Sequence, residues 1–136
     1  MTAPGWTDTA VWYAVYPLGM TGALHPTDPS EGHRLTRVEG WLDHLVSLGC
    51  NGLLLGPIFT SRSHGYDTLD YFSIDPRLGD DADFDHLVQA CHDRGIRVLL
   101  DGVFNHSGDS CAWFDRYRTG DGSGATRSEE SPYRNW

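Results

Sequence analysis

The sequence predicts an α/β fold in which apolar strands alternate with amphipathic helices. Apolar segments typical of strands begin near residues 11, 51 and 96. Successive strands are therefore separated by about forty residues, which leaves room for one helix between each pair. A helix that ends at a glycine and is followed by an apolar strand occurs twice, at Gly49 and at Gly95. The predicted order is strand, helix, strand, helix, strand, with the strands parallel in one sheet.

The first predicted strand covers residues 11–16, which are rich in aromatic and β-branched side chains, and it stops at Pro17. Residues 19–31 are rich in Gly, Pro, Thr and Asp, which predicts a loop. The first helix is predicted over residues 35–48. Its apolar side chains recur at the spacing of one helical face, at Leu35, Val38, Trp41, Leu42, Leu45 and Leu48.

The second predicted strand, residues 51–55, is a short continuous apolar run, as expected of a parallel strand buried on both faces. Residues 56–80 are predicted to form a long loop, and long loops without regular structure are usually functional. The second helix begins near Asp81, where several acidic residues suit the positive end of the helix dipole. Its apolar face comprises Phe84, Leu87, Val88 and Cys91. The third strand, residues 96–100, is predicted to be buried.

Length and charge restrict the class of protein. A chain of 136 residues can form one domain, but a complete (β/α)8 barrel needs about 250 residues. The net charge of −9 disfavours nucleic acids and anionic membranes as partners. The polar N-terminus has no signal-peptide pattern and no apolar run matches a membrane span, so we expect a cytoplasmic protein. Cys50, Cys91 and Cys111 lack CxxC spacing and are expected to be free, buried thiols.

Two polar clusters follow the second and third predicted strands. The first covers residues 64–71, and the second covers residues 101–106 directly after the third strand. In α/β barrels the carboxyl ends of the strands carry the active site, so we expect the two clusters to share one pocket. A doubly wound sheet is the alternative architecture. It is disfavoured because no GxGxxG or GxxxxGK[ST] motif follows the first strand.

The two clusters resemble the α-amylase superfamily, glycoside hydrolase family 13. The matching segments are Gly-Tyr-Asp-Thr-Leu-Asp-Tyr at residues 65–71, Ile-Asp-Pro at 74–76 and Asp-Gly-Val-Phe-Asn-His-Ser-Gly at 101–108. The resemblance implies a partial TIM (β/α)8 barrel. Residues 1–107 would be its first three β/α units, and residues 108–136 the irregular start of a subdomain that the family inserts after strand three.

The resemblance also implies an enzyme of carbohydrate metabolism, a retaining hydrolase or transglycosylase. Its partner would be an α-glucan or oligosaccharide, such as a short malto-oligosaccharide or a related α-glucoside. In the family, the nucleophile, the proton donor and a third carboxylate follow strands four, five and seven, which this sequence does not contain. We therefore expect no catalytic carboxylate here and no activity from this chain alone. Open sheet edges lead us to expect association with further chains.

The residues that the resemblance places in this chain bind sugar. Tyr66 matches the tyrosine that stacks on the sugar at the cleavage point, and His106 matches a histidine that hydrogen-bonds its primary hydroxyl and supports the transition state. Asp67 matches an acidic residue that holds hydroxyls of the terminal sugar in members acting on short oligosaccharides. His64 matches a position that contacts the same sugar. Asp101 matches a carboxylate that orients an arginine on strand four, a supporting role.

The resemblance suggests one metal and requires no cofactor. Asn105 matches a calcium ligand of many α-amylases, but Phe104 before it is typical of the cyclomaltodextrinase and neopullulanase branch, where that site is not dependable. An amide without companion carboxylates is a weak calcium ligand.

Other interpretations remain open from the residues alone. Tyr66 could be a core tyrosine, Asp67 a loop-capping aspartate and His64 an ordinary loop histidine. The chain could be a non-catalytic sugar-binding or interaction module built on a barrel fragment. It could also be a metal-dependent barrel hydrolase with Asp101 and His106 as ligands. We reject a catalytic pair made of Asp67 with Asp70 or Asp101, because pairs of carboxylates are common in acidic proteins.

Overall fold

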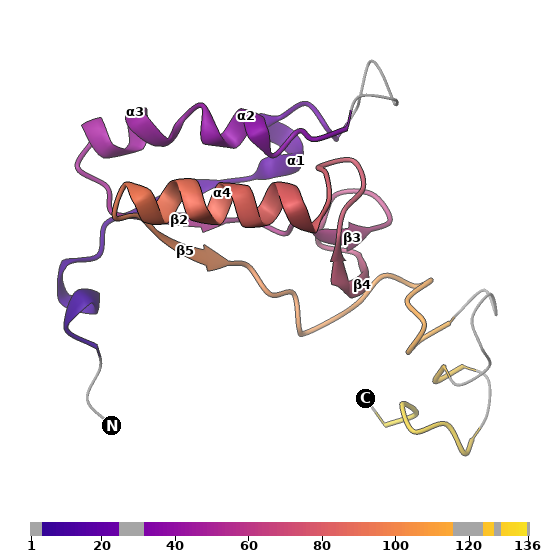
Figure 1. The fold of residues 1–136 in the computed structure, drawn as a ribbon. Coiled ribbons are helices and arrows are strands. Elements are labelled where there is room, and N and C mark those ends of the chain that lie inside the picture. Colours follow the sequence, from indigo (N-terminus) through magenta and orange to yellow (C-terminus); the bar gives the residue numbers. More distant parts are fainter. Residues whose placement is uncertain (1–3, 25–31, 116–123, 127–128, 136) are drawn as a thin grey trace.

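The structure, a computed structural model, describes residues 4–24, 32–115, 124–126 and 129–135 (Figure 1). The elements are the 3₁₀ helix η1 (Gly5–Thr9), β1 (Trp12–Val15), α1 (Pro17–Met20), α2 (Thr36–Glu39), α3 (Leu42–Ser47), β2 (Gly52–Leu55), β3 (Phe59–Ser61), β4 (Thr68–Ile74), α4 (Asp81–Asp93) and β5 (Arg97–Leu100). Strands β1, β2 and β5 form a parallel sheet with β2 in the centre, so the predicted α/β order is confirmed. Even α4, the longest described helix, lacks the length and apolar character of a membrane span.

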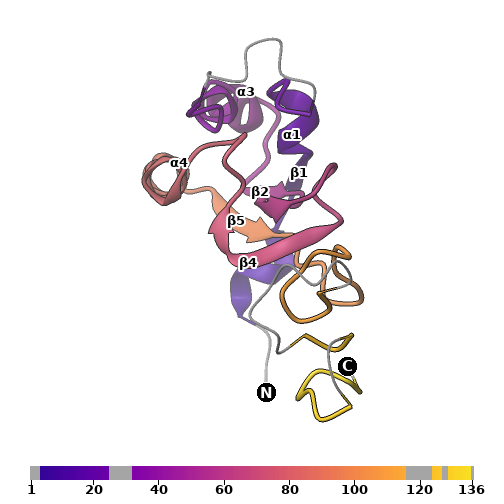
Figure 2. The ribbon, with the colours of Figure 1, turned by 90° about the vertical axis from the view of Figure 1, so that its right-hand side faces the viewer.

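The helices cover one face of the parallel sheet, as Figures 1 and 2 show for α3 and α4. Leu53 and Leu55 of β2 pack on that side in one core with Leu45 of α3 and Leu87 of α4. These four side chains are almost completely buried, as expected for a parallel strand against helices. The core confirms the apolar faces predicted at Leu45 and Leu87.

The opposite face of the sheet carries an apolar row that none of the described helices covers. Ala14, Leu54 and Leu99 lie side by side in the register of the three strands. Ala14 is exposed, and Leu99 keeps 47% of its surface exposed. Ile96 is buried as predicted, but β5 itself is not buried on both faces, because Val98 and Leu100 pack on the helix-covered core whereas Arg97 and Leu99 are exposed.

Three predicted segments differ from the structure. The helix predicted over residues 35–48 is divided into α2 and α3 by Gly40 and Trp41, consistent with the low helix propensity of glycine. Trp41 and Leu48 are consequently exposed rather than buried. Residues 56–80, predicted as an irregular loop, contain the antiparallel pair β3–β4. Pro17 starts the short helix α1 instead of a loop, since proline suits the first helical position.

The helix ends follow their predicted chemistry. Gly49 and Gly95 have φ of 78° and 70°, the left-handed conformation expected after a helix. Asp80 caps α4 in a capping box with Asp83, which also pairs with His33 at 2.7 Å. These glycines and caps set the direction in which the chain enters and leaves the sheet.

Residues 108–115, 124–126 and 129–135 form turns and bends without a helix or strand, as predicted for this segment. The domain boundary at residue 107 remains a prediction. Residues 116–123, 127–128 and 136, which belong to the same predicted subdomain, lie outside the described residues.

Candidate functional site at the carboxyl ends of the strands

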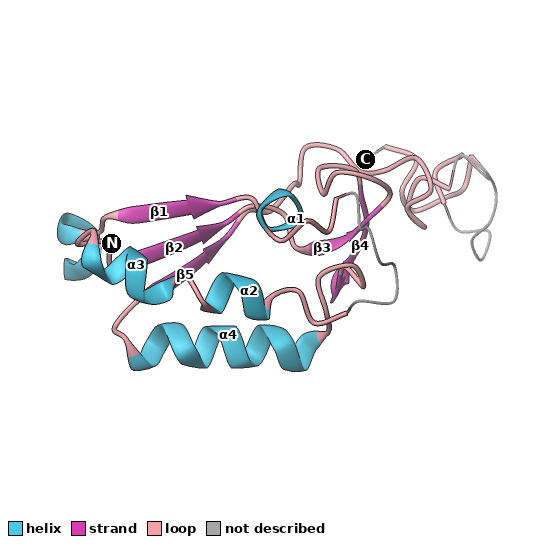
Figure 3. Ribbon diagram, turned by 90° about the horizontal axis from the view of Figure 1, so that it is seen from above, coloured by secondary structure: helices cyan, strands magenta, loops and turns pink. Residues whose placement is uncertain are grey.

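The two polar clusters meet where β2 and β5 end. Figure 3 shows these strands pointing toward the end of the sheet where β3 and β4 lie. The amide of Gly108 donates to the Thr68 carbonyl oxygen at 2.7 Å, and a Cβ at Gly108 would lie 2.6 Å from the Asp67 carbonyl oxygen. Only glycine allows this close approach of the two backbones. Nε2 of His106 lies 2.9 Å from the Tyr66 carbonyl oxygen, so the predicted clusters are in direct contact.

Tyr66 presents an aromatic ring at the surface. Its side chain is 42% exposed, and its ring stacks on Tyr16, with centroids 6.5 Å apart. The Tyr16 hydroxyl donates to the His64 carbonyl oxygen at 2.8 Å, which fixes this second ring. Partial burial raises the pKa of the Tyr66 phenol, and its hydrogen bond with the Asp101 carboxylate raises it further. Tyr66 is therefore a surface tyrosine whose ring packs against Tyr16, and not a core tyrosine.

Asp67 turns its carboxylate toward its own loop. Oδ1 accepts hydrogen bonds from the amides of Ser63 and His64, and Oδ2 accepts one from the Ser63 hydroxyl at 2.5 Å. Partial burial works against ionisation, but the Ser63 bonds and the nearby His64 outweigh it and hold the pKa of this carboxyl below its usual value. Asp67 thus makes the contacts of a loop-capping aspartate. A sugar hydroxyl would have to use the remaining lone pairs of its oxygens.

His64 is exposed and belongs to the same turn. Its Nδ1 accepts a hydrogen bond from the Tyr66 amide at 3.3 Å and lies 3.9 Å from Oδ1 of Asp67. These contacts orient its ring beside Tyr66, with the centroids 6.2 Å apart. His64 therefore lies beside the Tyr66 ring, where the resemblance places a contact with the sugar.

A buried ion pair holds the loop that carries Tyr66 and Asp67. The Asp75 side chain is 1% exposed and receives hydrogen bonds from Arg77 Nε and a terminal guanidinium nitrogen at 2.8 and 2.7 Å. It also accepts bonds from the amide and hydroxyl of Ser61 at the start of the loop. Because a buried carboxylate must be fully paired, these bonds fasten the start of the loop at Ser61 to the segment that follows β4.

His106 lines a cavity of about 310 Å³ together with Asn105, Ser107 and Asp109. A carbonyl oxygen only accepts hydrogen bonds, so Nε2 of His106 carries the proton in its bond to Tyr66. Nδ1 is then the ring nitrogen that accepts a hydrogen bond in the neutral side chain. Asp109 of this lining pairs with Arg62 at 2.5 Å. Neither Tyr66 nor Asp67 is part of this lining.

The described residues around Asn105 offer few calcium ligands, and the calcium site at Asn105 stays a prediction. Calcium takes six to eight oxygen ligands, most of them carboxylates or carbonyls. The cavity wall offers the Asn105 amide, the Ser107 hydroxyl and the Asp109 carboxylate, which Arg62 already neutralises. In the described part of the chain, the three side chains that gather within ligand distance of one another are His33, Asp80 and Asp83, at the start of α4. Among the described residues, Asp101 and His106 belong to no such group.

Sequence reasoning did not single out two tyrosines of this region. Tyr16 backs Tyr66, and Tyr71 places its hydroxyl against the loop of His106. The position of Tyr16 at the end of a predicted strand is a signal that could have identified it. Tyr71 lies in a segment predicted to be irregular, so the direction of its side chain could not be deduced.

Parallel strands with helices on one face, and polar loops that meet at the strand ends, are features of the β/α units of a (β/α)8 barrel. The family described as alpha amylase, catalytic domain, matches residues 25–136, and the chain belongs to this family. Intracellular maltogenic amylase of Bacillus subtilis is 38% identical over 98% of this chain and 24% of its own length. Cyclomaltodextrinase of a Bacillus species is 37% identical, with coverages of 98% and 25%.

Solved structures agree with this assignment. Cyclic α-maltosyl-(1→6)-maltose hydrolase from Arthrobacter globiformis, in complex with maltose, aligns with a TM-score of 0.75 and 36% identity. The alignment covers 98% of this chain and 32% of that structure. The chain thus spans about a quarter of the curated relatives it matches, as their coverages of 24% and 25% state.

Proposed function

We propose that this chain forms the N-terminal part of the catalytic barrel of a retaining α-glucosidic-bond hydrolase or transglycosylase. The hydrogen bond from His106 to the Tyr66 backbone carbonyl carries the proposal, because it brings the residue whose ring is expected to stack on the sugar beside the histidine expected to bind that sugar. Both residues lie after parallel strands of one sheet, where barrel enzymes bind substrates.

The exposed face of the sheet supports a barrel. In a (β/α)8 barrel, side chains from neighbouring strands fill the interior in layers, and branched apolar residues dominate. The row of Ala14, Leu54 and Leu99 has this character and lies on the face opposite the helices. We expect the remaining strands of the full-length protein to cover this row. That closure would also pair the open edges of β1 and β5.

The described residues would bind and orient the sugar. Its apolar face would stack on Tyr66, and Tyr16 behind that ring would keep it in place. Nδ1 of His106 would accept a hydrogen bond from a sugar hydroxyl, leaving Nε2 on the Tyr66 carbonyl. Retaining hydrolysis needs a nucleophile and an acid/base about 5 Å apart. The Asp67 carboxylate is already hydrogen-bonded within its own loop. We therefore assign the nucleophile and the acid/base to the rest of the full-length protein.

The names of the relatives support a substrate class. Two relatives are named for maltogenic amylase and cyclomaltodextrinase activity, and the Arthrobacter structure contains maltose. We infer a short malto-oligosaccharide or related α-glucoside as the substrate of this protein. We place the protein in the cytoplasm, in line with the intracellular location that the name of the Bacillus subtilis relative states.

The test compares two histidine variants of the full-length protein on maltotriose. We expect His106→Ala to lower kcat by about a hundredfold and to change KM much less, since its bond strengthens as charge develops on the sugar. His92→Ala, on the exposed end of α4, serves as the control and should leave both constants unchanged. An inactive wild-type protein, or equal effects of the two variants, would contradict the proposed function.

A further inference from the structure

The hydroxyl of Tyr71 in β4 braces the loop that carries His106. It donates a hydrogen bond to the Val103 carbonyl oxygen at 2.5 Å, and the His106 carbonyl oxygen lies 3.1 Å from the same hydroxyl. A phenol has one proton to donate, so the two carbonyls share it, with the shorter bond to Val103. One side chain therefore spans the backbone on both sides of Phe104 and Asn105.

The backbone of this loop has little other support. Residues 101–107 belong to no helix or strand. Asp101 and Gly108 anchor its two ends by donating backbone hydrogen bonds to carbonyls of β2 and β4. Between those ends, the described backbone makes one turn bond, from the amide of Phe104. The Tyr71 hydroxyl is consequently in contact with the loop backbone at two points, one of them at the histidine itself.

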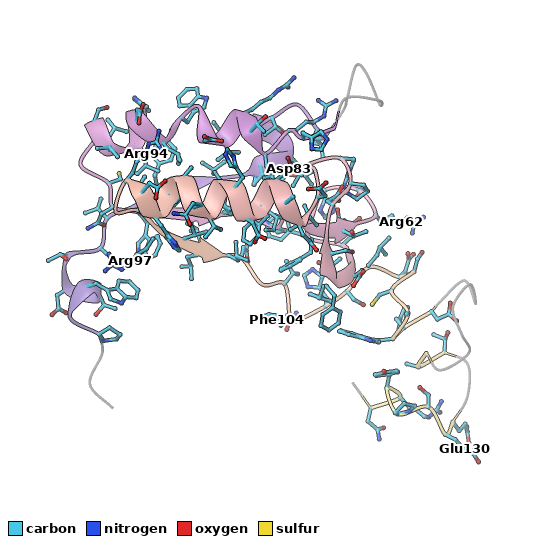
Figure 4. The ribbon with its side chains drawn as sticks, viewed as in Figure 1. Arg62, Asp83, Arg94, Arg97, Phe104 and Glu130 are labelled. Carbon is cyan, nitrogen blue, oxygen red and sulfur yellow. The ribbon has the colours of Figure 1, made fainter. Side chains whose placement is uncertain are left out.

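Aromatic neighbours fix the direction of the Tyr71 ring. Trp113 stacks on it nearly parallel, with centroids 5.4 Å apart and an interplanar angle of 5°. Phe104 stacks at 6.0 Å and Phe59 packs at 6.4 Å, and these rings line one cavity of about 370 Å³. Figure 4 shows Phe104 on the loop after β5, on the side away from α4. Because rings hold the phenol in place, its hydroxyl reaches the two carbonyls from a preset position.

We propose that Tyr71 is a positioning residue for His106. Its hydroxyl holds residues 103–106 so that the His106 ring keeps Nε2 on the Tyr66 carbonyl and presents Nδ1 to the sugar. The inference rests on the proposed function, because His106 acts on a sugar only in that enzyme. Tyr71 acts through the loop and does not itself contact the sugar.

The test is Tyr71→Phe in the full-length protein, which removes the hydroxyl and keeps the stacked ring. Tyr13→Phe, on the helix-covered side of the sheet, is the matched control. The first readout is independent of activity. Nitrogen NMR of the histidine rings, with the His106 signals assigned by their loss in His106→Ala, reports which ring nitrogen carries the proton. We expect the Nε2 proton signal of His106 to broaden or shift in Tyr71→Phe and to stay unchanged in Tyr13→Phe.

The second readout is kinetic. We expect Tyr71→Phe to lower kcat about tenfold with KM changed less than twofold, as for loss of one well-placed hydrogen bond. In a His106→Ala background the same change should have no further effect, because the positioned group is absent. A full tenfold loss in that background would show a merely structural role and overturn the proposal. An unchanged His106 signal would also overturn it. A wild-type protein without glycosidase activity refutes the proposed function alone, and the NMR readout still decides whether Tyr71 positions His106.

Discussion

Asp75→Ala should destabilise the loop that carries Tyr66 and Asp67. The size of the free-energy loss can be worked out from the buried ion pair of Asp75 with Arg77. Removing one partner of a buried pair costs about 3–5 kcal/mol, because the other charge is left uncompensated. The Asp75 side chain is 1% exposed, whereas the Arg77 side chain keeps 25% of its surface in contact with water. Water can therefore partly solvate the guanidinium that remains. We expect the free-energy cost of the substitution to lie at the lower end of this range, at about 3 kcal/mol.

Amide hydrogen exchange measures this loss locally. The Leu78 amide donates to the Asp75 carbonyl oxygen at 2.7 Å, and the substitution leaves that carbonyl in place. A loss of about 3 kcal/mol should speed its exchange about a hundredfold. Asp70→Ala, which removes an exposed carboxylate that bonds Phe72 and Ser73, is the control and should leave Leu78 unchanged. Unchanged exchange in Asp75→Ala, or equal acceleration in both variants, would refute the reasoning.

The same pair predicts a pH dependence. Burial alone would raise the pKa of the Asp75 carboxyl, but the hydrogen bonds and charge of Arg77 outweigh it and hold the pKa below its usual value. A carboxylate with a lowered pKa stabilises the fold above its unfolded pKa of about 3.9, and this stabilisation is lost as pH falls through the folded value. The difference in Leu78 exchange between wild type and Asp75→Asn should therefore shrink below about pH 4. A difference that stays constant down to about pH 2 would contradict this assignment.

Three further changes test the site and the core. Asp67→Ala should reduce kcat/KM on maltose-sized substrates more than on long malto-oligosaccharides, and equal losses would exclude a role in holding the terminal sugar. Gly108→Ala should lower the thermal midpoint by several degrees, since its Cβ would meet the Asp67 carbonyl oxygen at 2.6 Å, and an unchanged midpoint would contradict that contact. A thiol reagent at about pH 8 should modify half-buried Cys50 first, because Cys91 and Cys111 are buried and burial raises the pKa of Cys91 to about 11. Faster modification of Cys91 would show that its packing is not as described.

Local signals in the sequence were sufficient to predict the parallel sheet and the contact between the two polar clusters. Gly49 and Gly95 stop helices by adopting φ values that other residues avoid, so their effect depends little on the rest of the fold. Because parallel strands must end on the same side of a sheet, Tyr66 and His106 could be placed together without knowledge of any side-chain contact.

The remaining features depend on contacts between distant segments. The β3–β4 pair joins residues such as Ser61 and Thr68 with irregular register, which no local periodicity encodes. The bond from Tyr71 to Val103 spans 32 residues and requires knowing how β4 packs on the following loop. The predicted burial of Leu99 was wrong, because a continuous apolar run does not show which face a sheet leaves open.

A crystal structure of the full-length protein with bound maltose would test the central claim most directly. We predict one glucose ring stacked on Tyr66, with a sugar hydroxyl within hydrogen-bond distance of the His106 ring. We also predict that further strands cover the row of Ala14, Leu54 and Leu99. Maltose bound away from Tyr66 and His106, or a sheet that leaves Leu99 exposed to solvent in the full-length protein, would contradict the account.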